Sequence, residues 1–181
     1  MLRVISGKVR GLKLDTPKNE DVRPTTDRVK ESLFNIINPY IIDSNVLDLF
    51  AGTGNLTIEA LSWGAKSVDS VEMHPKSLAI IKKNLEHLKI TEGTKVIRSD
   101  VLKFLKDFRG DAYDLILIDP PFTEKMAHSV METLTKSSVF HPNTIIMVEY
   151  SKHERMETEY ETLKAFDTRS FGDKLVSFFK V

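Results

Sequence analysis

The sequence predicts an α/β fold in which helices cover both faces of one mostly parallel β-sheet, with an antiparallel hairpin closing one edge. Short apolar runs alternate with amphipathic stretches through the middle of the chain, which is typical of consecutive βαβ units. The alternation ends near the C-terminus, where two strand-like segments flank the turn sequence Phe171-Gly172-Asp173. A length of 181 residues, with 41% hydrophobic and 29% charged residues, is typical of one globular domain.

Each core element is predicted from a local pattern. The run NVLDLF at residues 45–50 has the length of a buried strand, and residues 55–63 form a helix that Gly64 ends. A helix at residues 75–88 begins with Pro75, which suits the first helical position, and carries leucine and isoleucine at helical spacing. We expect the remaining strands at residues 67–72, 94–98, 111–119, 144–150, 162–170 and 174–181, and helices at residues 101–108 and 125–136.

The N-terminal part departs from this alternation. Residues 3–14 are expected to form a small hairpin hinged at Ser6-Gly7, and residues 26–37 a helix with its apolar side chains on one face. No stretch has the composition of a linker, so we predict one domain over residues 1–181. It comprises a basic N-terminal hairpin appendage at 1–22, a helix at 23–38 and the catalytic core at 44–181.

Composition excludes several classes of protein. No apolar run is long enough to span a bilayer, and the N-terminus lacks the apolar region of a signal peptide. Cysteine is absent, which excludes disulfides and is compatible with a reducing compartment. The five histidines do not combine with carboxylates at metal-ligand spacing, and no nucleophile elbow of a hydrolase occurs. We therefore expect a cytoplasmic, monomeric protein that binds no metal and no membrane.

Positive charge is concentrated at the N-terminus of a chain whose formal net charge is zero. Arg3, Lys8, Arg10 and Lys13 occur in a stretch, residues 1–14, that contains no acidic residue. A protein without net charge has no strong overall attraction to nucleic acid. Taken alone, the cluster is better interpreted as a solvated edge strand than as a patch for phosphates.

A glycine-containing turn, DLFAGTG at residues 48–54, follows the first core strand. Ligands of open α/β sheets bind at such turns, outside the carboxyl ends of the strands. Gly52 and Gly54 allow the backbone to approach a ligand closely, with Phe50 beside them. Asp48 would repel a pyrophosphate but suits a ligand with an ammonium group, such as the methionine moiety of S-adenosylmethionine.

Two further acids follow the next two strands. Glu72 ends the second core strand, where a carboxylate can accept hydrogen bonds from ribose hydroxyls, and Asp100 follows the third. A dinucleotide site is the alternative, but Thr57 stands where that fingerprint needs a third glycine or alanine. Each acid alone could be a helix cap, whereas their placement at one sheet edge favours a cofactor site.

A second motif, Asp119-Pro120-Pro121-Phe122, follows the fourth core strand. The prolines fix the backbone and remove donors, so carbonyl oxygens face outward beside the Asp119 carboxylate. Phe122 adds a flat apolar ring. Acceptors beside an aromatic ring are suited to a flipped-out base, which needs stacking and hydrogen bonds to its Watson–Crick edge. The alternative is a purely structural Pro-Pro turn.

The acid at position 119 discriminates between bases. Guanine presents N1–H and N2–H side by side, which match the two oxygens of a carboxylate. Adenine presents an acceptor at N1, which an ionised Asp119 would repel. Acceptors that relieve the positive charge developing on the amine would also favour its attack on a sulfonium methyl group. Asp119 therefore favours guanine N2 over adenine N6 as the target.

Several motifs together resemble the RsmD-type guanine-N2 methyltransferases of bacterial 16S rRNA. These are RPTTDRVKE at residues 23–31, DLFAGTG at 48–54 with IEAL at 58–61, and DPPF at 119–122. The resemblance extends over nearly the whole chain and is more specific than any one motif. Lys30 stands where arginine is common in the family, and Ser6 where glycine is frequent.

The resemblance implies a Rossmann-like class I methyltransferase fold and methylation of one guanine, guanine 966, in rRNA of the small ribosomal subunit or its assembly intermediates. Met73 would pack against the adenine of S-adenosylmethionine, and Asp100 with the Val101 amide would read the adenine edge. Arg23 and Arg28 would face RNA together with the basic hairpin. On this basis the basic residues near the N-terminus are interpreted as a patch for phosphates and not as a solvated edge strand.

Two alternatives remain open at this point. The chain could be a related methyltransferase that acts on another RNA guanine, a DNA base amine or a protein amide. It could also be a ribosome assembly factor that binds cofactor and RNA without catalysis, although the intact Asp119 and Pro120 disfavour this.

Overall fold

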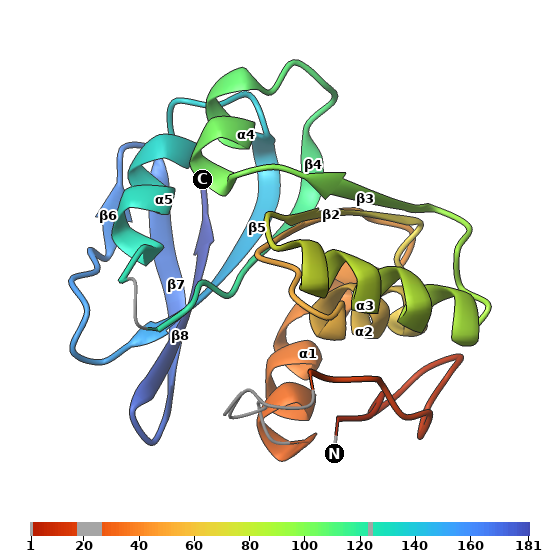
Figure 1. Ribbon diagram of the computed structural model, residues 1–181. Coiled ribbons are helices and arrows are strands. Elements are labelled where there is room, and N and C mark those ends of the chain that lie inside the picture. The colour runs from red at the N-terminus through yellow and green to blue at the C-terminus, as the bar shows by residue number, and fades with distance from the viewer. Residues whose placement is uncertain (1, 18–26, 123–124) are drawn as a thin grey trace.

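The computed structural model describes residues 2–17, 27–122 and 125–181, and every structural statement below refers to these residues. An eight-stranded sheet with the order β3-β2-β1-β4-β5-β8-β7-β6 runs through the molecule (Figure 1). Its strands are β1 (Asn45–Leu49), β2 (Ser67–Glu72), β3 (Thr94–Arg98), β4 (Tyr113–Ile118), β5 (Phe140–Ser151), β6 (Glu159–Tyr160), β7 (Leu163–Phe171) and β8 (Lys174–Lys180). The first five strands are parallel to one another, and β8, β7 and β6 continue the sheet with antiparallel pairing. This is the predicted mixed sheet.

Helices cover both faces of the sheet, as predicted. They are α1 (Asp27–Ile41), α2 (Asn55–Trp63), α3 (Pro75–His87), α4 (Val101–Asp107) and α5 (Ala127–Leu134). One hydrophobic cluster joins one sheet face to α1, α2 and α3, and a second joins the other face to α4 and α5, the arrangement seen in Figure 1. In β4, Leu115 and Leu117 enter the first cluster while Ile116 and Ile118 enter the second. Burial on both faces explains why the core strands read as continuous apolar runs.

The N-terminal segment, residues 2–17, differs in detail from the predicted hairpin. Its two arms pair through a single antiparallel bridge between Arg3 and Lys13, flanked by the hydrogen bond from Leu14 N to Leu2 O at 3.0 Å. The turn is wider than a hinge at Ser6-Gly7. Gly7 has a φ of 80°, and a Cβ there would lie 1.8 Å from Ser62 O, so only glycine allows this close approach to α2. Leu2, Val4 and Leu14 are buried in the same cluster as α1 and α2, which packs the segment against the core.

Other boundaries shift by a few residues. Helix α1 continues to Ile41, although Pro39 lies in its last turn, and Ile41 is fully buried. Strand β5 begins at Phe140 because its pairing with β4 starts there, before a register shift between Tyr113 and Leu115. The two-residue strand β6 was not predicted, since a strand that short has no periodicity to detect. Helix α5 is shorter than predicted at both ends, and none of the helices described could cross a membrane.

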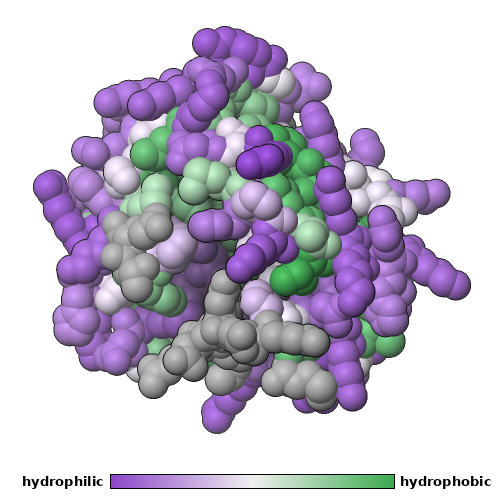
Figure 2. Space-filling view, viewed as in Figure 1, coloured by the Kyte–Doolittle hydropathy of each residue, from purple (hydrophilic) through white to green (hydrophobic). Residues whose placement is uncertain are grey.

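The surface carries a mixture of charges. Figure 2 shows hydrophilic side chains over most of the rim of the face viewed in Figure 1, with more hydrophobic side chains visible nearer its centre. The full sequence has equal numbers of basic and acidic residues, 26 of each, and a formal net charge of zero.

Candidate functional site

The register of the sheet places the predicted site residues at one edge. Leu49 of β1 pairs with Val71 of β2 and with Ile118 of β4. Phe50, Glu72 and Asp119 each follow directly after one of these paired residues. Because parallel strands end on the same side, the glycine turn and the Asp119 loop lie next to one another.

Asp48 is fully buried on the side of β1 that faces α2. The Thr57 hydroxyl donates to Asp48 Oδ2 at 2.6 Å and lies 2.8 Å from the Ser70 hydroxyl. The other oxygen, Oδ1, has no hydrogen-bond partner within the described parts of the chain. Burial raises the pKa of Asp48 to about 7, the hydrogen bonds from Thr57 oppose this shift, and the charge of Glu72 adds to it. A buried carboxylate oxygen without a partner is an acceptor available to a ligand.

The glycine turn is held in a left-handed conformation at three positions: Phe50 with a φ of 70°, Gly52 with 55° and Gly54 with 85°. Positive φ at a phenylalanine is uncommon and marks a constrained turn. A Cβ at Gly54 would lie 2.6 Å from Ile81 Cγ1, so glycine also allows α3 to pack close to the turn.

Glu72 connects this turn to the next loop. Its Oε2 accepts from Gly52 N at 2.8 Å, and its Oε1 accepts from His74 N at 2.7 Å. Two backbone amides therefore fix the orientation of the carboxylate that was predicted to bind ribose. Met73, which lies between Glu72 and His74, is 53% exposed, so its apolar side chain is accessible at this loop.

Asp100 and Val101 lie at the start of α4. The Asp100 carboxylate accepts from Lys103 N at 2.8 Å, so it caps this helix, the role that any one of the acids could have had. Val101 is buried, and its amide is in the first helical turn, where backbone N–H groups lack partners within a helix. Both residues are brought to the sheet edge that carries Asp48 and Glu72.

The Asp119 loop is joined by two residues that sequence reasoning missed. Ile118 pairs with Val148, which places Asp119 beside Glu149 of β5. The ammonium of Lys174, the first residue of β8, forms an ion pair with Glu149 and lies 4.3 Å from the centroid of the Phe122 ring. Pro120 is buried and Pro121 is exposed. An acidic residue inside the apolar run IIMVEY was the available signal for Glu149, whereas Lys174 had none.

The charges around Asp119 oppose one another. Burial raises the pKa of Asp119 well above its ordinary value, and the negative charge of Glu149 raises it further. Lys174 lowers the pKa, and Asp48 raises it. The Asp48 charge therefore acts on the Asp119 carboxyl group, which agrees with the position of both residues at the same sheet edge.

The predicted RNA-binding residues lie mainly on the N-terminal segment. Lys8, Arg10 and Lys13 are exposed there, and Arg28 is exposed on α1. Arg3 is also exposed, with its Nε 2.6 Å from Asp27 Oδ2. Arg23 and the rest of the first four residues of the RPTTDR motif, 23–26, lie outside the described residues.

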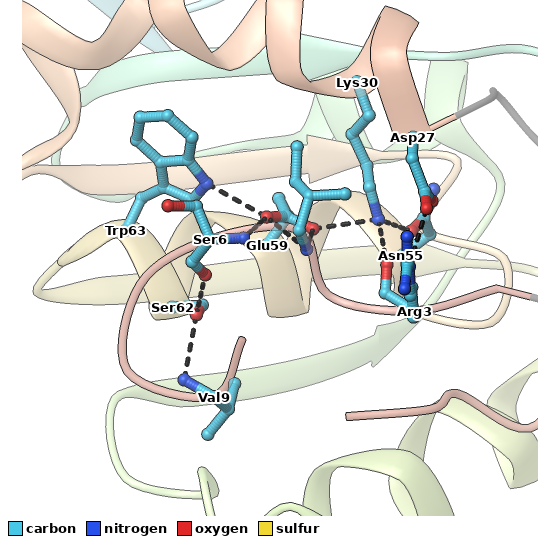
Figure 3. Close-up of polar contacts among 10 residues, drawn as sticks. Arg3, Ser6, Val9, Asp27, Lys30, Asn55, Glu59, Ser62 and Trp63 are labelled. Carbon is cyan, nitrogen blue, oxygen red and sulfur yellow. Dashed lines mark hydrogen bonds and ion pairs between the residues drawn. The ribbon is translucent and has the colours of Figure 1, made fainter. Parts of the chain in front are cut away.

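A buried ion pair fastens this segment to the helices, a feature that sequence reasoning did not predict. Lys30 Nζ of α1 is 2.8 Å from Glu59 Oε2 of α2, and both side chains are fully buried (Figure 3). Lys30 Nζ also donates to Arg3 O at 2.6 Å and to Asn55 Oδ1 at 2.9 Å. The Glu59 carboxylate accepts from Ile5 N at 3.1 Å. Since Asn55 directly follows the glycine turn, the pair links the basic segment to the candidate cofactor site.

Comparison with known proteins agrees with this geometry. The family described as conserved hypothetical protein 95 matches residues 2–180. A ribosomal RNA small subunit methyltransferase D from Haemophilus influenzae is 41% identical over 159 residues, which cover 87% of this chain and 82% of that protein. A putative rRNA methyltransferase, YlbH, from Bacillus subtilis is 32% identical over 186 residues, covering 99% of this chain and 98% of that protein.

A solved structure has the same fold as this chain. The putative methyltransferase yhhF from Escherichia coli has a TM-score of 0.88 and 30% sequence identity, covering 99% of this chain and 97% of that chain. This likeness confirms the predicted Rossmann-like methyltransferase fold. The chain therefore belongs to the conserved hypothetical protein 95 family, that of the RsmD-type ribosomal RNA methyltransferases.

Proposed function

We propose that this protein transfers the methyl group of S-adenosylmethionine to the exocyclic N2 of one guanine in 16S rRNA, guanine 966 by resemblance. The observation that carries the proposal is the adjacency of two acids with separate surroundings, one fully buried and one partly exposed. Asp48 lies behind the glycine turn, and Asp119 lies beside an aromatic ring and a Pro-Pro turn. One suits the cofactor and the other suits the base.

The residues around the glycine turn fit the methyl donor. The oxygen of Asp48 that has no partner among the described residues is an acceptor for the ammonium of the methionine moiety. Gly52 leaves space beside the backbone for the ligand, and Gly54 gives the turn its left-handed conformation. Glu72 is oriented to accept from the ribose hydroxyls. In this proposal Met73 packs against the adenine, and Asp100 with the Val101 amide binds the adenine edge. When bound, S-adenosylmethionine supplies an electrophilic methyl group on its sulfonium sulfur.

The Asp119 loop fits guanine as the acceptor. Two carboxylate oxygens match N1–H and N2–H, and the Phe122 ring offers a stacking face. As the new N–C bond forms, positive charge develops on N2, and the nearby carboxylate stabilises it. A carboxylate with a raised pKa can also take the proton that N2 releases. The rigid carbonyls of Pro120 and Pro121 add acceptors at the same loop.

Recognition of RNA is assigned to the basic N-terminal segment. Arg3, Lys8, Arg10 and Lys13 would contact phosphates, with Arg28 and Arg23 extending this surface. A neutral protein with one basic region suits a substrate that is recognised largely by shape, such as folded rRNA in a small subunit or an assembly intermediate. We propose that the protein acts as a cytoplasmic monomer, organised as one catalytic domain with the basic segment attached.

The test is methyl transfer from labelled S-adenosylmethionine to small subunits isolated from a strain that lacks the enzyme. Free 16S rRNA and duplex DNA serve as competing acceptors, and the product is identified by nucleoside analysis and by mapping the modified position. We expect N2-methylguanosine at one position in rRNA of the subunits. N6-methyladenine in DNA, or label in protein, would contradict the proposal. Binding of cofactor and subunits without any transfer would favour the non-catalytic assembly factor.

A further inference from the structure

A charged pair, Glu149 and Lys174, lies next to the Asp119 loop. Neither residue belongs to the motifs that the sequence displays. Glu149 lies on β5 and is 3% exposed, and the Lys174 side chain on β8 is 22% exposed. Strands β5 and β8 pair so that Ser151 lies opposite Lys174 and Glu149 opposite Val176. The lysine therefore reaches back along its neighbour strand to meet the glutamate.

We propose that Lys174 is a positioning residue for the methyl-accepting base, anchored by Glu149 and holding Phe122 and Asp119 in one arrangement. This inference rests on the proposed function, because it assigns Phe122 and Asp119 to the base. It adds a specificity element from the C-terminal hairpin to a site otherwise built from the parallel half of the sheet.

Lys174 lies against the Phe122 ring. The centroid of this ring lies 4.3 Å from Lys174 Nζ, a distance typical of a cation–π contact. The ring is half-buried and follows the exposed Pro121. In this proposal the ammonium, which the buried Glu149 holds, fixes the orientation of the ring, and the base stacks on the face opposite the ammonium.

Lys174 also affects the charge on the Asp119 carboxyl group. Asp48 of β1, Glu149 of β5 and Lys174 of β8 act on this carboxyl group, and only Lys174 favours its ionised form. Guanine recognition needs acceptors toward N1–H and N2–H, so Asp119 must be ionised when the base binds. Without the ammonium, Asp119 would be left with acidic neighbours only, and protonation would turn one acceptor into a donor.

The proposal is tested by Lys174→Met and Lys174→Arg in the full chain. Methyl transfer to small subunits is measured as kcat against pH, and the Asp119 carboxyl is titrated by NMR of aspartate labelled at that carbon. For Lys174→Met we expect about a tenfold lower kcat at neutral pH, and an acid limb and Asp119 titration moved to higher pH by about one unit. Lys174→Arg should retain both, because the charge and the cation–π contact persist.

Lys180→Met is the matched control. Lys180 lies on the same strand, and its ammonium is 5.4 Å from the centroid of the Phe166 ring, so the substitution removes the same kind of contact outside the site. We expect its kcat, pH profile and cofactor binding to equal those of the unmodified protein. A uniform loss in both variants would indicate an effect on β8 as a whole and would overturn the proposal.

The double variant Lys174→Met/Glu149→Gln covers the case in which Lys174→Met alone does not fold. Its Glu149→Gln substitution removes the buried charge that Lys174→Met would leave without a partner. Its Asp119 titration should return toward the original pH, while kcat stays low because the ring is no longer held. Original kcat in this variant, or an original pH profile in Lys174→Met, would overturn the inference. If the unmodified protein transfers no methyl group to guanine, the proposed function itself fails, which is a separate outcome.

Discussion

At the scale of single residues, Asp48 lowers the stability of the folded protein but suits the proposed binding of the cofactor. A carboxyl group that is fully buried, with one oxygen unpartnered among the described atoms, makes the folded state less favourable than a neutral group would. In the proposed function, the ammonium of S-adenosylmethionine completes the hydrogen bonding of Asp48, which would offset this cost when the cofactor is bound. Active sites commonly contain residues of this kind.

The pH dependence of folding follows from the same residue. The pKa of Asp48 is about 7 in the folded protein against an ordinary value of 3.8, so the folded state retains a proton that the unfolded chain releases between these values. The contribution of Asp48 to stability therefore falls as the pH rises from about 4 to about 7. Asp48→Asn should be more stable than the unmodified protein above this range, by up to about 4 kcal/mol.

Urea unfolding of the cofactor-free protein at about pH 5 and about pH 8 measures this effect. The advantage of Asp48→Asn should be larger at the higher pH, while calorimetry should show weaker binding of S-adenosylmethionine. An equal difference in stability at both values would mean that Asp48 does not titrate in this range.

Gly54 allows a prediction about packing, with Gly172 as the control. Both glycines have positive φ, 85° and 65°, but a Cβ at Gly172 meets nothing within 4 Å whereas one at Gly54 lies 2.6 Å from Ile81 Cγ1. Gly172→Ala should cost only the backbone strain, about 1 kcal/mol. Gly54→Ala should cost about 2–4 kcal/mol and weaken cofactor binding, as overpacking adds to the strain. Equal losses in urea unfolding would exclude the contact with Ile81 as a cause.

At the scale of elements, the N-terminal segment is attached at both ends to the neighbourhood of the glycine turn. Near its start, Lys30 joins Arg3 O to Asn55. Near its end, Asp15 N donates to Asn84 Oδ1 at 2.8 Å, and Asn84 Nδ2 donates to Thr53 O at 2.9 Å. Lys30 and Asn84 therefore position the basic N-terminal segment relative to the glycine turn.

The buried pair between Lys30 and Glu59 should contribute strongly to stability. Lys30→Met leaves the Glu59 charge buried without its partner, and we expect a loss of about 3–5 kcal/mol in urea unfolding. Lys83→Met is the comparison, because the pair of Lys83 with Asp15 is exposed to solvent and should contribute little to stability. A loss below 1 kcal/mol for Lys30→Met would show that the pair is not needed to hold the segment.

The same elements show how far local pattern predicts structure. Helix α2 and strands β2 and β3 have the predicted bounds, because apolar spacing and the terminal glycine after α2 are local signals. The wide N-terminal turn was not predicted, because it depends on how closely Gly7 approaches α2. Tertiary proximity, rather than residues adjacent in sequence, determines that turn.

At the scale of the whole molecule, the site combines predicted motifs with unpredicted partners. Asp48, Glu72 and Asp100 were predicted at one edge because parallel strands end together. Glu149 and Lys174 depend on the register between β5 and β8, and Lys30 with Glu59 on the packing of two helices. Pairings of this kind depend on long-range geometry that a single sequence does not display.

The charge distribution of the molecule predicts how RNA binding depends on salt. Replacing Lys8, Arg10 and Lys13 together by Gln should weaken binding to small subunits and reduce the slope of log affinity against log salt by about 2–3, since each lost phosphate contact removes roughly 0.7–0.9. Binding of S-adenosylmethionine should be unchanged. Filter binding at several salt concentrations measures the slope.

The control for that variant replaces Lys95, Lys106 and Lys136, which are exposed residues outside the N-terminal segment. It carries the same change in net charge, so it separates local contacts from overall attraction. A similar decrease in slope for both variants would count against the N-terminal segment as the RNA-binding surface.

The proposed function requires Asp119 as the acceptor for guanine, and one measurement tests this requirement directly. The rate of methyl transfer from saturating S-adenosylmethionine to small subunits is compared between the unmodified protein and Asp119→Asn, with the product identified as a nucleoside. We predict N2-methylguanosine from the unmodified protein and a kcat on the order of 100-fold lower for Asp119→Asn, with cofactor binding unchanged. Full activity of Asp119→Asn on guanine would contradict the account.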